Sequence, residues 1–434
     1  MPVVFSLDGR ASPDHTLAFS LGVNGAHLTV AVAGFYIIHK VANSNKHARH
    51  LWPVTLALFA LTATFLFFVS DPQTPFQDFR KAYWQAGAAI WGGPQRLAGI
   101  YQSSVFGFVN LPIVSYFFAP FGLLPEKLSG VAFSLVCGPA LIYAWDATAR
   151  MLSFDREQRA LSLFALAVYG PLIHSLRQAN ASHLVLAMIV WALMCARAGR
   201  SWWSGAGFGF AALIKPPLLL IGVYFFLRGR WKIVLAGTAV LVAATVLSIA
   251  VFGWALHVVW YGTCVKPFLG GVVVGFNAQS IAAVLARFEF GTGVLWDWTP
   301  YEPSPLTKVA IQIGSFAMIG MAFWACRKGK TQVEIELALV LALICLISSL
   351  SWSHYFVWLL PGFAILFAST ALKRHEPQFR WSILAAFALA APTQFLSAPM
   401  ATGIYPGALL LTSHLAIAGI MVFALLCKLR SRSA

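Results

Sequence analysis

The sequence predicts an all-α polytopic membrane protein, and three observations support this prediction. Of the 434 residues, 59% are hydrophobic and 10% are charged, whereas about 25% of the residues in a soluble globular chain are charged. The mean hydropathy is +0.76. The apolar residues also form runs close to the roughly 20 residues that a helix needs to cross a bilayer. This composition excludes a soluble enzyme, a disordered chain, a coiled coil and a nucleic-acid-binding domain.

Hydrophobic runs occur along the whole chain, which we interpret as a single transmembrane domain, 1–434, with about 11 to 13 membrane-spanning helices. The first run, 16–38, is weak because it contains Asn24, His27 and several glycines, so it could lie in the interface. The remaining runs cover residues 52–70, 107–124, 129–148, 160–176, 181–197, 205–227, 231–251, 306–326, 334–350, 354–372, 381–398 and 403–427.

Five basic clusters contain half of all Lys and Arg residues. An even number of runs separates each cluster from the next, so all five can lie on one face, which the positive-inside rule assigns to the cytoplasm. We therefore interpret the net charge of +16 as a topology signal rather than as a signal of nucleic-acid binding. The clusters are Lys40/Lys46/Arg49, Arg228/Arg230/Lys232, Arg327/Lys328/Lys330, Lys373/Arg374/Arg380 and Lys428/Arg430/Arg432.

Strict alternation of the runs fits poorly between residues 107 and 227. It places the arginines of 150–159 and 197–200 on the outside, and it places residues 177–180 on the inside. Either a run in this region is broken or re-entrant, or its short loops do not follow the positive-inside rule. The sequence Lys215-Pro216-Pro217 lies within an apolar run and is a candidate break, because proline interrupts a helix.

The same scheme predicts two long outer segments, 71–106 and 252–305, and a short outer turn at 351–354. Within the first segment we expect an amphipathic helix along the outer surface, with Asp78 near its N-terminal end. As an isolated residue, Asp78 is more simply explained as a helix N-cap. The apolar residues with helical spacing are Phe79, Ala82, Tyr83, Ala86 and Ile90.

Six motifs follow one another between residues 78 and 360. They are Asp78-Phe79 with Ala86-Gly87 and Ile100-Tyr101, Asn110-Leu111-Pro112 with Ala119-Pro120 and Leu124-Pro125, Gln178-Ala179-Asn180, Gly205 to Lys215-Pro216-Pro217, Asn277-Ala278-Gln279-Ser280 with Arg287, and Ser351-Trp352-Ser353-His354-Tyr355. Together they resemble the signature of the polyprenyl-phosphate-dependent glycosyltransferases of family 87. This C-type membrane class includes mycobacterial polyprenol-phosphate-mannose mannosyltransferases. The sequence departs from this pattern at Arg177, Ala278 and Tyr355. These departures bear on the identity of the substrate more than on the class of enzyme.

The resemblance implies a helical bundle with extracytoplasmic loop helices in the bacterial inner membrane. It also implies an inverting transfer of a sugar, with mannose favoured, from a polyprenyl-phosphate-sugar to a hydroxyl of a lipid or glycan acceptor on the periplasmic face. The residues alone point the same way. Nucleotide sugars are cytoplasmic and the chain has no Gly-rich phosphate loop, so an enzyme on the outer face must receive its activated group from a membrane lipid.

The resemblance assigns Asp78 as the general base, because glycosyl transfer needs a carboxylate to deprotonate the attacking hydroxyl. For the leaving phosphate, the candidates are Arg287, His354, Arg80 and Lys81. The simpler explanations are a snorkelling side chain for Arg287 and an interfacial histidine for His354. Lys266 is better explained as a surface charge. Further substrate contacts are expected from Tyr83, Tyr101, Arg177, Gln178, Asn180, Lys215, Asn277, Ser280 and Trp352.

No cofactor or metal is expected, because the sequence lacks H-E-x-x-H and D-x-D motifs and the phosphate can be held by cationic side chains. Two other functions are considered. A lipid or sugar transporter or flippase would suit the intramembrane Lys215, although the runs show no two-fold repeat. A membrane ligase or acyltransferase would also act on lipid-borne groups.

Overall fold

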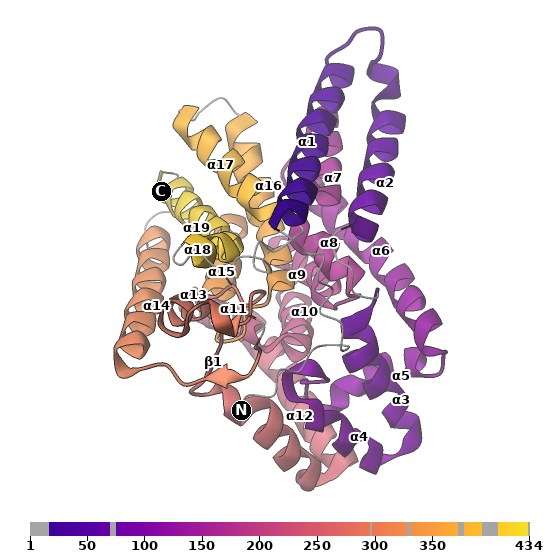
Figure 1. Ribbon diagram of the computed structural model, residues 1–434, viewed down its shortest axis with the longest axis vertical. Coiled ribbons are helices and arrows are strands. Elements are labelled where there is room, and N and C mark those ends of the chain that lie inside the picture. Colours follow the sequence, from indigo (N-terminus) through magenta and orange to yellow (C-terminus); the bar gives the residue numbers. More distant parts are fainter. Residues whose placement is uncertain are drawn as a thin grey trace.

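The computed structural model describes residues 17–69, 75–295, 297–327, 331–371, 377–392 and 407–432. Within these ranges the chain is almost entirely helical (Figure 1), and the only sheet found there is an antiparallel pair of two-residue strands, β1 (Val272–Val273) and β2 (Pro300–Tyr301). The predicted fold class is therefore confirmed. Four residues of the predicted basic clusters, Lys328, Lys330, Lys373 and Arg374, lie outside the described ranges.

The helices follow the hydrophobic runs closely. The α-helices are α1 (Leu17–Ala42), α2 (Leu51–Val69), α3 (Gln85–Gly92), α4 (Pro94–Ile100), α5 (Ser115–Gly122), α6 (Glu126–Met151), α7 (Arg156–Ala167), α8 (Gly170–Arg177), α9 (Ser182–Arg197), α10 (Ser201–Ile214), α11 (Leu219–Leu227), α12 (Trp231–Trp260), α13 (Ile281–Phe290), α14 (Pro305–Cys326), α15 (Val333–Ile347), α16 (Leu360–Ala371), α17 (Pro377–Ala390), α18 (Gly407–Thr412) and α19 (His414–Arg432). Two π-helical segments are η2 (Phe79–Trp84) and η6 (Tyr261–Val265). The 3-10 segments are η1 (Ala48–His50), η3 (Tyr101–Phe106), η4 (Pro112–Val114), η5 (Pro216–Leu218), η7 (Lys266–Phe268), η8 (Thr292–Val294) and η9 (Ser353–Leu359).

Six helices of the described part are long and apolar enough to span a bilayer, namely α1, α2, α6, α12, α14 and α19. A seventh span is formed if α7 and α8, which are bent by 54° at their junction, count as one. Among the described residues the count of six or seven is below the predicted 11 to 13 spans, and the weak first run forms α1.

The run at 205–227 is interrupted at Lys215-Pro216-Pro217, as the sequence predicts. Proline lacks the backbone N–H that a continuous helix needs, so α10 ends at Ile214 and α11 begins at Leu219. The two helices then pack against each other, and the rings of Phe208 and Phe225 lie 5.3 Å apart. The run therefore forms a helical hairpin with Lys215 at its tip.

The direction of α10 relative to α12 shows that this hairpin is re-entrant. The two helices are parallel, because Gly205 faces Ile233 near the start of both and Gly209 faces Gly237 one turn later. These close approaches need glycine, since a Cβ on Gly205 would lie 2.2 Å from the carbonyl oxygen of Ile233. Because α12 starts again where α10 started, α11 must return the chain to the same end of the bundle.

The basic segments predicted to be cytoplasmic lie together at one end of the bundle, which we call the basic face. The end of α1 contacts the start of α7 through His39 and Glu157, at 2.6 Å between Nδ1 and Oε1. Arg197, at the end of α9, donates to the carbonyl oxygen of Met151 at the end of α6 (3.2 Å). It also pairs with Glu334 at the start of α15 (3.0 Å).

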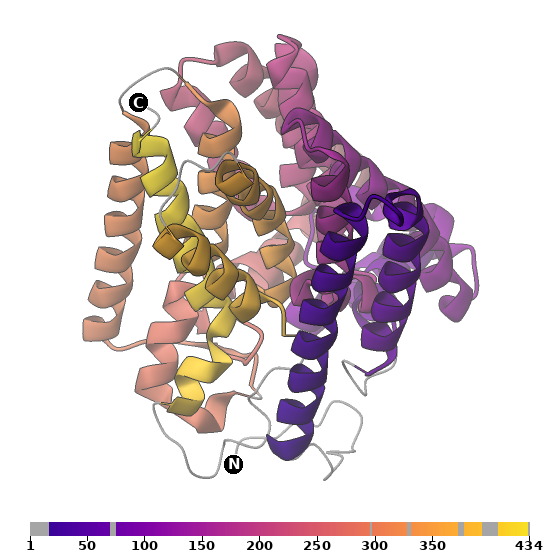
Figure 2. The same ribbon diagram turned by 90° about the horizontal axis from the view of Figure 1, so that it is seen from above.

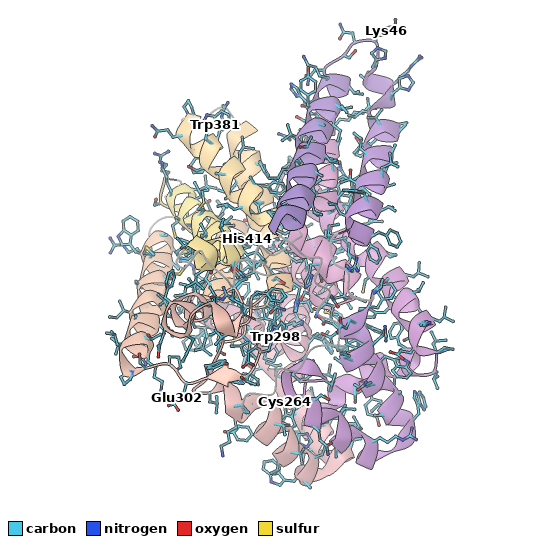
Figure 3. The ribbon with its side chains drawn as sticks, in the orientation of Figure 1. Lys46, Cys264, Trp298, Glu302, Trp381 and His414 are labelled. Atoms are coloured by element: carbon cyan, nitrogen blue, oxygen red, sulfur yellow. The ribbon has the colours of Figure 1, made fainter. Side chains whose placement is uncertain are left out.

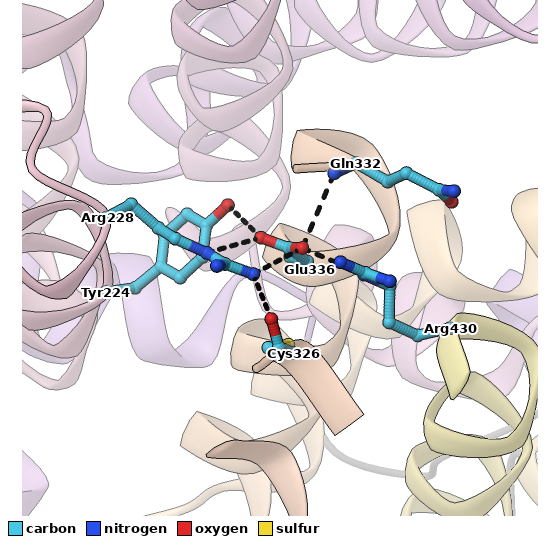
Figure 4. A network of polar contacts seen from close by, with 6 residues as sticks. All are labelled: Tyr224, Arg228, Cys326, Gln332, Glu336 and Arg430. Carbon is cyan, nitrogen blue, oxygen red and sulfur yellow. Dashed lines mark hydrogen bonds and ion pairs between the residues drawn. The ribbon is translucent and has the colours of Figure 1, made fainter. Parts of the chain in front are cut away.

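A buried ion cluster joins four further helix ends on the basic face (Figure 4). The fully buried carboxylate of Glu336 accepts from Arg228 (2.5 Å) and from the equally buried Arg430 (2.8 Å). Tyr224 donates to the same carboxylate (2.9 Å), and Arg228 also donates to the carbonyl oxygen of Cys326 (2.7 Å). Removing one partner of such a cluster is costly because the other charges stay buried.

Figure 2 shows that other parts of the basic face lie on the same side of the molecule. The end of α19 and the connection from α1 to α2 both lie toward the upper part of this view.

These contacts correct the strict alternation of runs. The arginines at 150–159 and 197–200 lie on the basic face, and residues 177–180 lie at the opposite end of α9, roughly 24 Å away along its 16 residues. The physical reason is that two runs do not cross. The run at 107–124 forms only η4 and α5, which together are too short to span, and α10 and α11 form the re-entrant hairpin.

The second predicted outer segment is largely structured. Helix α12 passes a kink at Gly253, whose φ of 76° suits glycine, and continues to Trp260. The segment then contains η6, η7, β1, α13, η8 and β2. Figure 3 shows Trp298 near the centre of the molecule, and its indole N–H donates to the side-chain oxygen of Asn277 (2.7 Å).

Candidate active site

Asp78 stands at the beginning of a helix that continues through η2 into α3. The predicted spacing is confirmed, since Phe79, Ala82 and Tyr83 are buried. The helix does not lie free on the surface, however. Tyr83 stacks on Phe118 at 4.4 Å between ring centroids, so α5 covers this helix. Packing of aromatic side chains against a neighbouring helix therefore fixes the position of Asp78.

The Asp78 carboxylate does not cap this helix. The residue is itself in helical conformation and its side chain makes no capping hydrogen bond. The first amides of the helix are satisfied by Gln178 instead, whose side-chain oxygen accepts from the Asp78 N–H (3.2 Å) and whose carbonyl accepts from the Phe79 N–H (3.1 Å). The N-cap explanation is thus wrong for the side chain, which is left to interact elsewhere.

The partner of the carboxylate is Asn180, whose side-chain N–H₂ lies 3.1 Å from Asp78 Oδ2. The side-chain oxygen of Asn180 accepts from both the N–H and the hydroxyl of Ser182, at 3.1 and 2.9 Å. Because the oxygen faces Ser182, the amide N–H₂ must face Asp78. The turn that presents Asn180 includes Ala179 at a φ of 47°, an unusual value for a residue with a side chain.

A buried cation lies beside this pair. Lys215, at the tip of the re-entrant hairpin, places its Nζ 3.5 Å from the phenolic oxygen of Tyr83 and 4.9 Å from the centre of the Tyr355 ring. Asp78 interacts electrostatically with both Lys215 and Tyr83. Burial, followed by the charge of Asp78, raises the pKa of Tyr83, so its phenol stays neutral. A buried ionisable side chain in an apolar run indicates a functional site.

Two histidines, His183 and His354, interact electrostatically with Lys215, and a third, His174, lies against His354. The ring of His354 stacks on that of His174, with centroids 6.5 Å apart. The Nδ1 atom of His183 forms a hydrogen bond with the hydroxyl of Ser175 (2.9 Å). The Nε2 atoms of His354 and His183 are buried and have no hydrogen-bond partner among the described residues. Buried polar atoms usually have a partner, so these nitrogens are suited to contact a ligand.

Electrostatic interactions connect His354 with Lys215, His174 and His183. Lys215 and His354 were predicted from the sequence, whereas His174 and His183 were not. The signal that could have identified His183 was present, because it is an ionisable residue in an apolar run and the same rule selected Lys215.

Tyr101 and Asn110 support the tip of the hairpin from outside. The Tyr101 hydroxyl donates to the carbonyl oxygen of Asn110 (2.9 Å), and the Asn110 side chain donates to the carbonyl oxygen of Ile214 (2.5 Å). Ile214 is the last residue of α10, where carbonyl groups lose their helical partners. These contacts give Tyr101 a structural role next to Lys215.

Arg287 is fully buried and uses its guanidinium to organise a loop. It donates to the carbonyl oxygens of Val274 (2.9 Å), Gly275 (2.6 Å) and Ala278, and to the hydroxyl of Ser413 (3.0 Å). These bonds occupy Nε and both terminal nitrogens. The contacts favour a structural role over the phosphate contact expected from the sequence.

The loop that Arg287 organises pairs with the segment before His354. Ala278 and Trp352 form an antiparallel bridge, and the Ser353 N–H donates to the carbonyl oxygen of Asn277 (2.8 Å). Ser280 caps α13 by accepting from the Ala283 N–H (3.1 Å). The two motifs thus meet in space, and together they hold the start of η9, from which His354 projects.

The remaining predicted residues lie around the Asp78 helix. Arg80 pairs with Glu126 at 2.5 Å, and both side chains are partly exposed. Lys81 is partly exposed as well. The guanidinium of Arg177 lies over the ring of Phe67 (5.9 Å) and donates to the carbonyl oxygen of the same residue. Arg177 therefore joins the end of α2 to the turn that contains Asn180.

The described residues contain no group of three or more His, Cys, Asp or Glu side chains arranged to hold a metal ion. The polar cluster consists instead of one carboxylate, one amide, one phenol, one ammonium group and imidazoles. Such a set can accept a proton and can contact an anionic group, which are the two requirements of glycosyl transfer from a phosphate.

Comparison with known proteins identifies the class. The family model of glycosyltransferase family 87 matches residues 108–349. Because this match covers more than half of the 434 residues, the chain belongs to glycosyltransferase family 87 and is a membrane glycosyltransferase. Family membership decides against the transporter and acyltransferase alternatives. Asp78 precedes the matched range, so the family match does not include it.

Two similar proteins are polyprenol-phosphate-mannose-dependent alpha-(1-2)-phosphatidylinositol mannoside mannosyltransferases. The protein from Mycolicibacterium smegmatis is 27% identical over 310 residues, which cover 65% of this chain and 66% of that protein. The protein from Mycobacterium tuberculosis is 25% identical over 347 residues, or 73% of this chain and 76% of that protein. A related pentamannoside mannosyltransferase from Mycolicibacterium smegmatis is 27% identical over 263 residues, or 58% of this chain and 59% of that protein. The alignments with the first and third of these proteins span slightly less than two thirds of their lengths.

Proposed function

We propose that the protein is an inverting glycosyltransferase that moves mannose from a polyprenyl-phosphate-mannose donor to a hydroxyl of a lipid or glycan acceptor. The observation that carries this proposal is the cluster of the partly buried Asp78 with the buried Asn180 and Lys215, because it combines a carboxylate with a cation in an apolar bundle. The printed names of the relatives support the donor, and their phosphatidylinositol mannoside acceptors suggest a glycolipid acceptor.

In the proposed reaction, Asp78 accepts the proton of the acceptor hydroxyl while the oxygen attacks the anomeric carbon of the sugar. The bond from that carbon to the phosphate oxygen breaks, and the polyprenyl phosphate leaves with the electron pair. Asn180 orients the carboxylate by donating to Oδ2, so that Oδ1 can face the acceptor. A positioned base of this kind contributes about 10²- to 10⁴-fold to the rate.

Lys215 and His354, with His183, are the groups we assign to the leaving phosphate. Lys215 supplies a charge, and the two histidines present Nε2 atoms that have no partner among the described residues. Fixed cations and hydrogen-bond donors stabilise the negative charge that develops on the phosphate. Arg287 and Arg80 are not part of this assignment, because Arg287 already donates to backbone carbonyl oxygens and Arg80 already pairs with Glu126. No divalent cation is needed in this scheme.

The charge distribution supports a proposal for the face on which the reaction occurs. The basic face carries the arginines and lysines that the positive-inside rule assigns to the cytoplasm. Asp78 lies at the opposite end of α9, so we propose that the site faces the periplasmic side of the bacterial inner membrane. Lys46 and Glu302, labelled in Figure 3, mark exposed positions suited to test this orientation.

The experiment is transfer by the purified full chain in proteoliposomes that contain labelled polyprenyl-phosphate-mannose and a phosphatidylinositol mannoside. We expect a labelled glycolipid, with no product when GDP-mannose replaces the lipid donor. Transfer from the nucleotide sugar, or no transfer from the lipid donor, would contradict the proposal. For orientation, a membrane-impermeant thiol reagent added to spheroplasts should label Glu302→Cys and not Lys46→Cys, and the reverse pattern would refute the assigned face.

A further inference from the structure

An apolar groove runs along the re-entrant hairpin, and nothing in the proposed reaction accounts for it. It has a volume of about 480 Å³ and lies between α10, α11 and α12. At one end it is lined by Ala212 and Leu218, which stand one turn before and one turn after Lys215. At the other end it is lined by Phe226 and Ile233, near the basic face.

Small residues create the groove. Gly205 and Gly209 let α10 approach α12 closely, so that backbone atoms form the floor of the groove. Gly222 of α11 also lines the groove, and a Cβ at this position would meet no atom within 4 Å. The buried floor and the half-exposed rim, which includes Val223, give the shape of a furrow open to lipid rather than of a closed cavity.

The ends of the groove determine what fits it. Thr238 is the one polar side chain among its lining residues. Lys215, which interacts electrostatically with Asp78, lies in the chain between Ala212 and Leu218, the residues that line the end of the groove. A ligand that matches both features has an anionic head group and a long hydrocarbon chain. A polyprenyl phosphate has this composition, and its chain would extend from the site toward the basic face.

We propose that the groove between α10, α11 and α12 binds the polyprenyl chain of the donor, with the phosphate at Lys215. This inference rests on the proposed function and adds the path of the lipid to it. Both parts of the hairpin then contribute to donor binding: its tip presents Lys215 to the phosphate, and its sides hold the chain. The glycines keep that path open.

The test compares donors with a long chain and with a short chain that ends before Gly222. Gly222→Leu fills the groove without a backbone clash, and Thr238→Phe fills it from an exposed position on α12. We expect the KM for the long-chain donor to rise about fivefold or more in both variants, since packing contacts rather than water exclusion hold a chain within a bilayer. The KM for the short-chain donor should change little.

The matched control is Gly320→Leu, because Gly320 lies exposed on α14 and a Cβ there also meets no atom within 4 Å. Its KM should equal that of the wild type for both donors. If either filled variant is monodisperse and keeps the wild-type ratio of the two KM values, the groove does not hold the donor chain. If the wild-type protein itself transfers no sugar from either donor, the proposed function has failed instead, so the two failures are distinguishable.

Discussion

Asn180 donates from its side-chain amide to Oδ2 of Asp78 at 3.1 Å, across 102 residues of sequence. This bond joins the first helix after α2 to the turn between α8 and α9. The same turn binds the backbone of Asp78 through Gln178, so the position of the carboxylate is fixed at both its main chain and its side chain. An enzyme that needs a base in one orientation gains from such a double attachment.

Replacing Asn180 with alanine should lower kcat by about tenfold to hundredfold, because a hydrogen bond to a charged group is worth about 1.5–3 kcal/mol. The measurement is the initial rate of mannose transfer at saturating donor. Asn43→Ala, an exposed asparagine near the basic face, should retain the wild-type rate. A wild-type kcat in a folded Asn180→Ala protein would show that this bond does not orient the base.

Replacing Lys215 with methionine should reduce transfer by about hundredfold or more, because the leaving phosphate loses its buried cation. Methionine matches the length and apolar surroundings of the lysine stem, so the thermal midpoint should stay near that of the wild type. Lys266→Met removes an exposed lysine from η7 and should have no effect. Unimpaired transfer by Lys215→Met would remove this residue from the site.

Arg287→Met should act on stability rather than on the donor. It leaves the carbonyl groups of Val274 and Gly275 buried without their donors, so we expect a loss of about 3 kcal/mol or more and a lower thermal midpoint. Exposed Arg230→Met serves as the control for a lost charge. A variant with wild-type thermal stability and a raised KM for the donor would support a phosphate contact by Arg287 and contradict the structural role.

These results show what the sequence could predict and what it could not. Hydropathy located nearly every helix, since long apolar runs have few alternatives in a membrane. It could not decide which runs cross, because α5 and the α10–α11 hairpin are as apolar as true spans and differ only in length and direction. Their failure to cross explains why strict alternation fits poorly at Arg197 and Asn180.

The resemblance selected Asp78 and His354, and the position of an ionisable residue in an apolar run selected Lys215, but neither determined what each side chain contacts. Arg287 illustrates this limit, because a guanidinium binds carbonyl groups as readily as phosphate oxygens. His183 was missed since a single histidine in an apolar run is usually a core residue. The rule that selected Lys215 would also select His183, and the electrostatic interaction of His183 with Lys215 in the folded chain makes that selection specific.

Transfer should not depend on a divalent metal. In the proposed scheme Lys215 supplies the positive charge and the histidines offer hydrogen bonds to the phosphate, so the scheme requires no divalent cation. We therefore expect the same rate in excess EDTA as in Mg²⁺. Loss of activity in EDTA that Mg²⁺ or Mn²⁺ restores would require a metal in the reaction.

The central claim is that Asp78 is the general base, and Asp78→Asn tests it most directly. The measurement is the single-turnover rate of mannose transfer from polyprenyl-phosphate-mannose by purified protein in proteoliposomes, with the exposed outer-segment variant Glu302→Gln as control. The account predicts a loss of about 10²- to 10⁴-fold for Asp78→Asn, in a protein that still folds, because the side-chain oxygen of the new asparagine can still accept from Asn180 and the side chain caps no helix. A rate near that of the wild type in Asp78→Asn would contradict it.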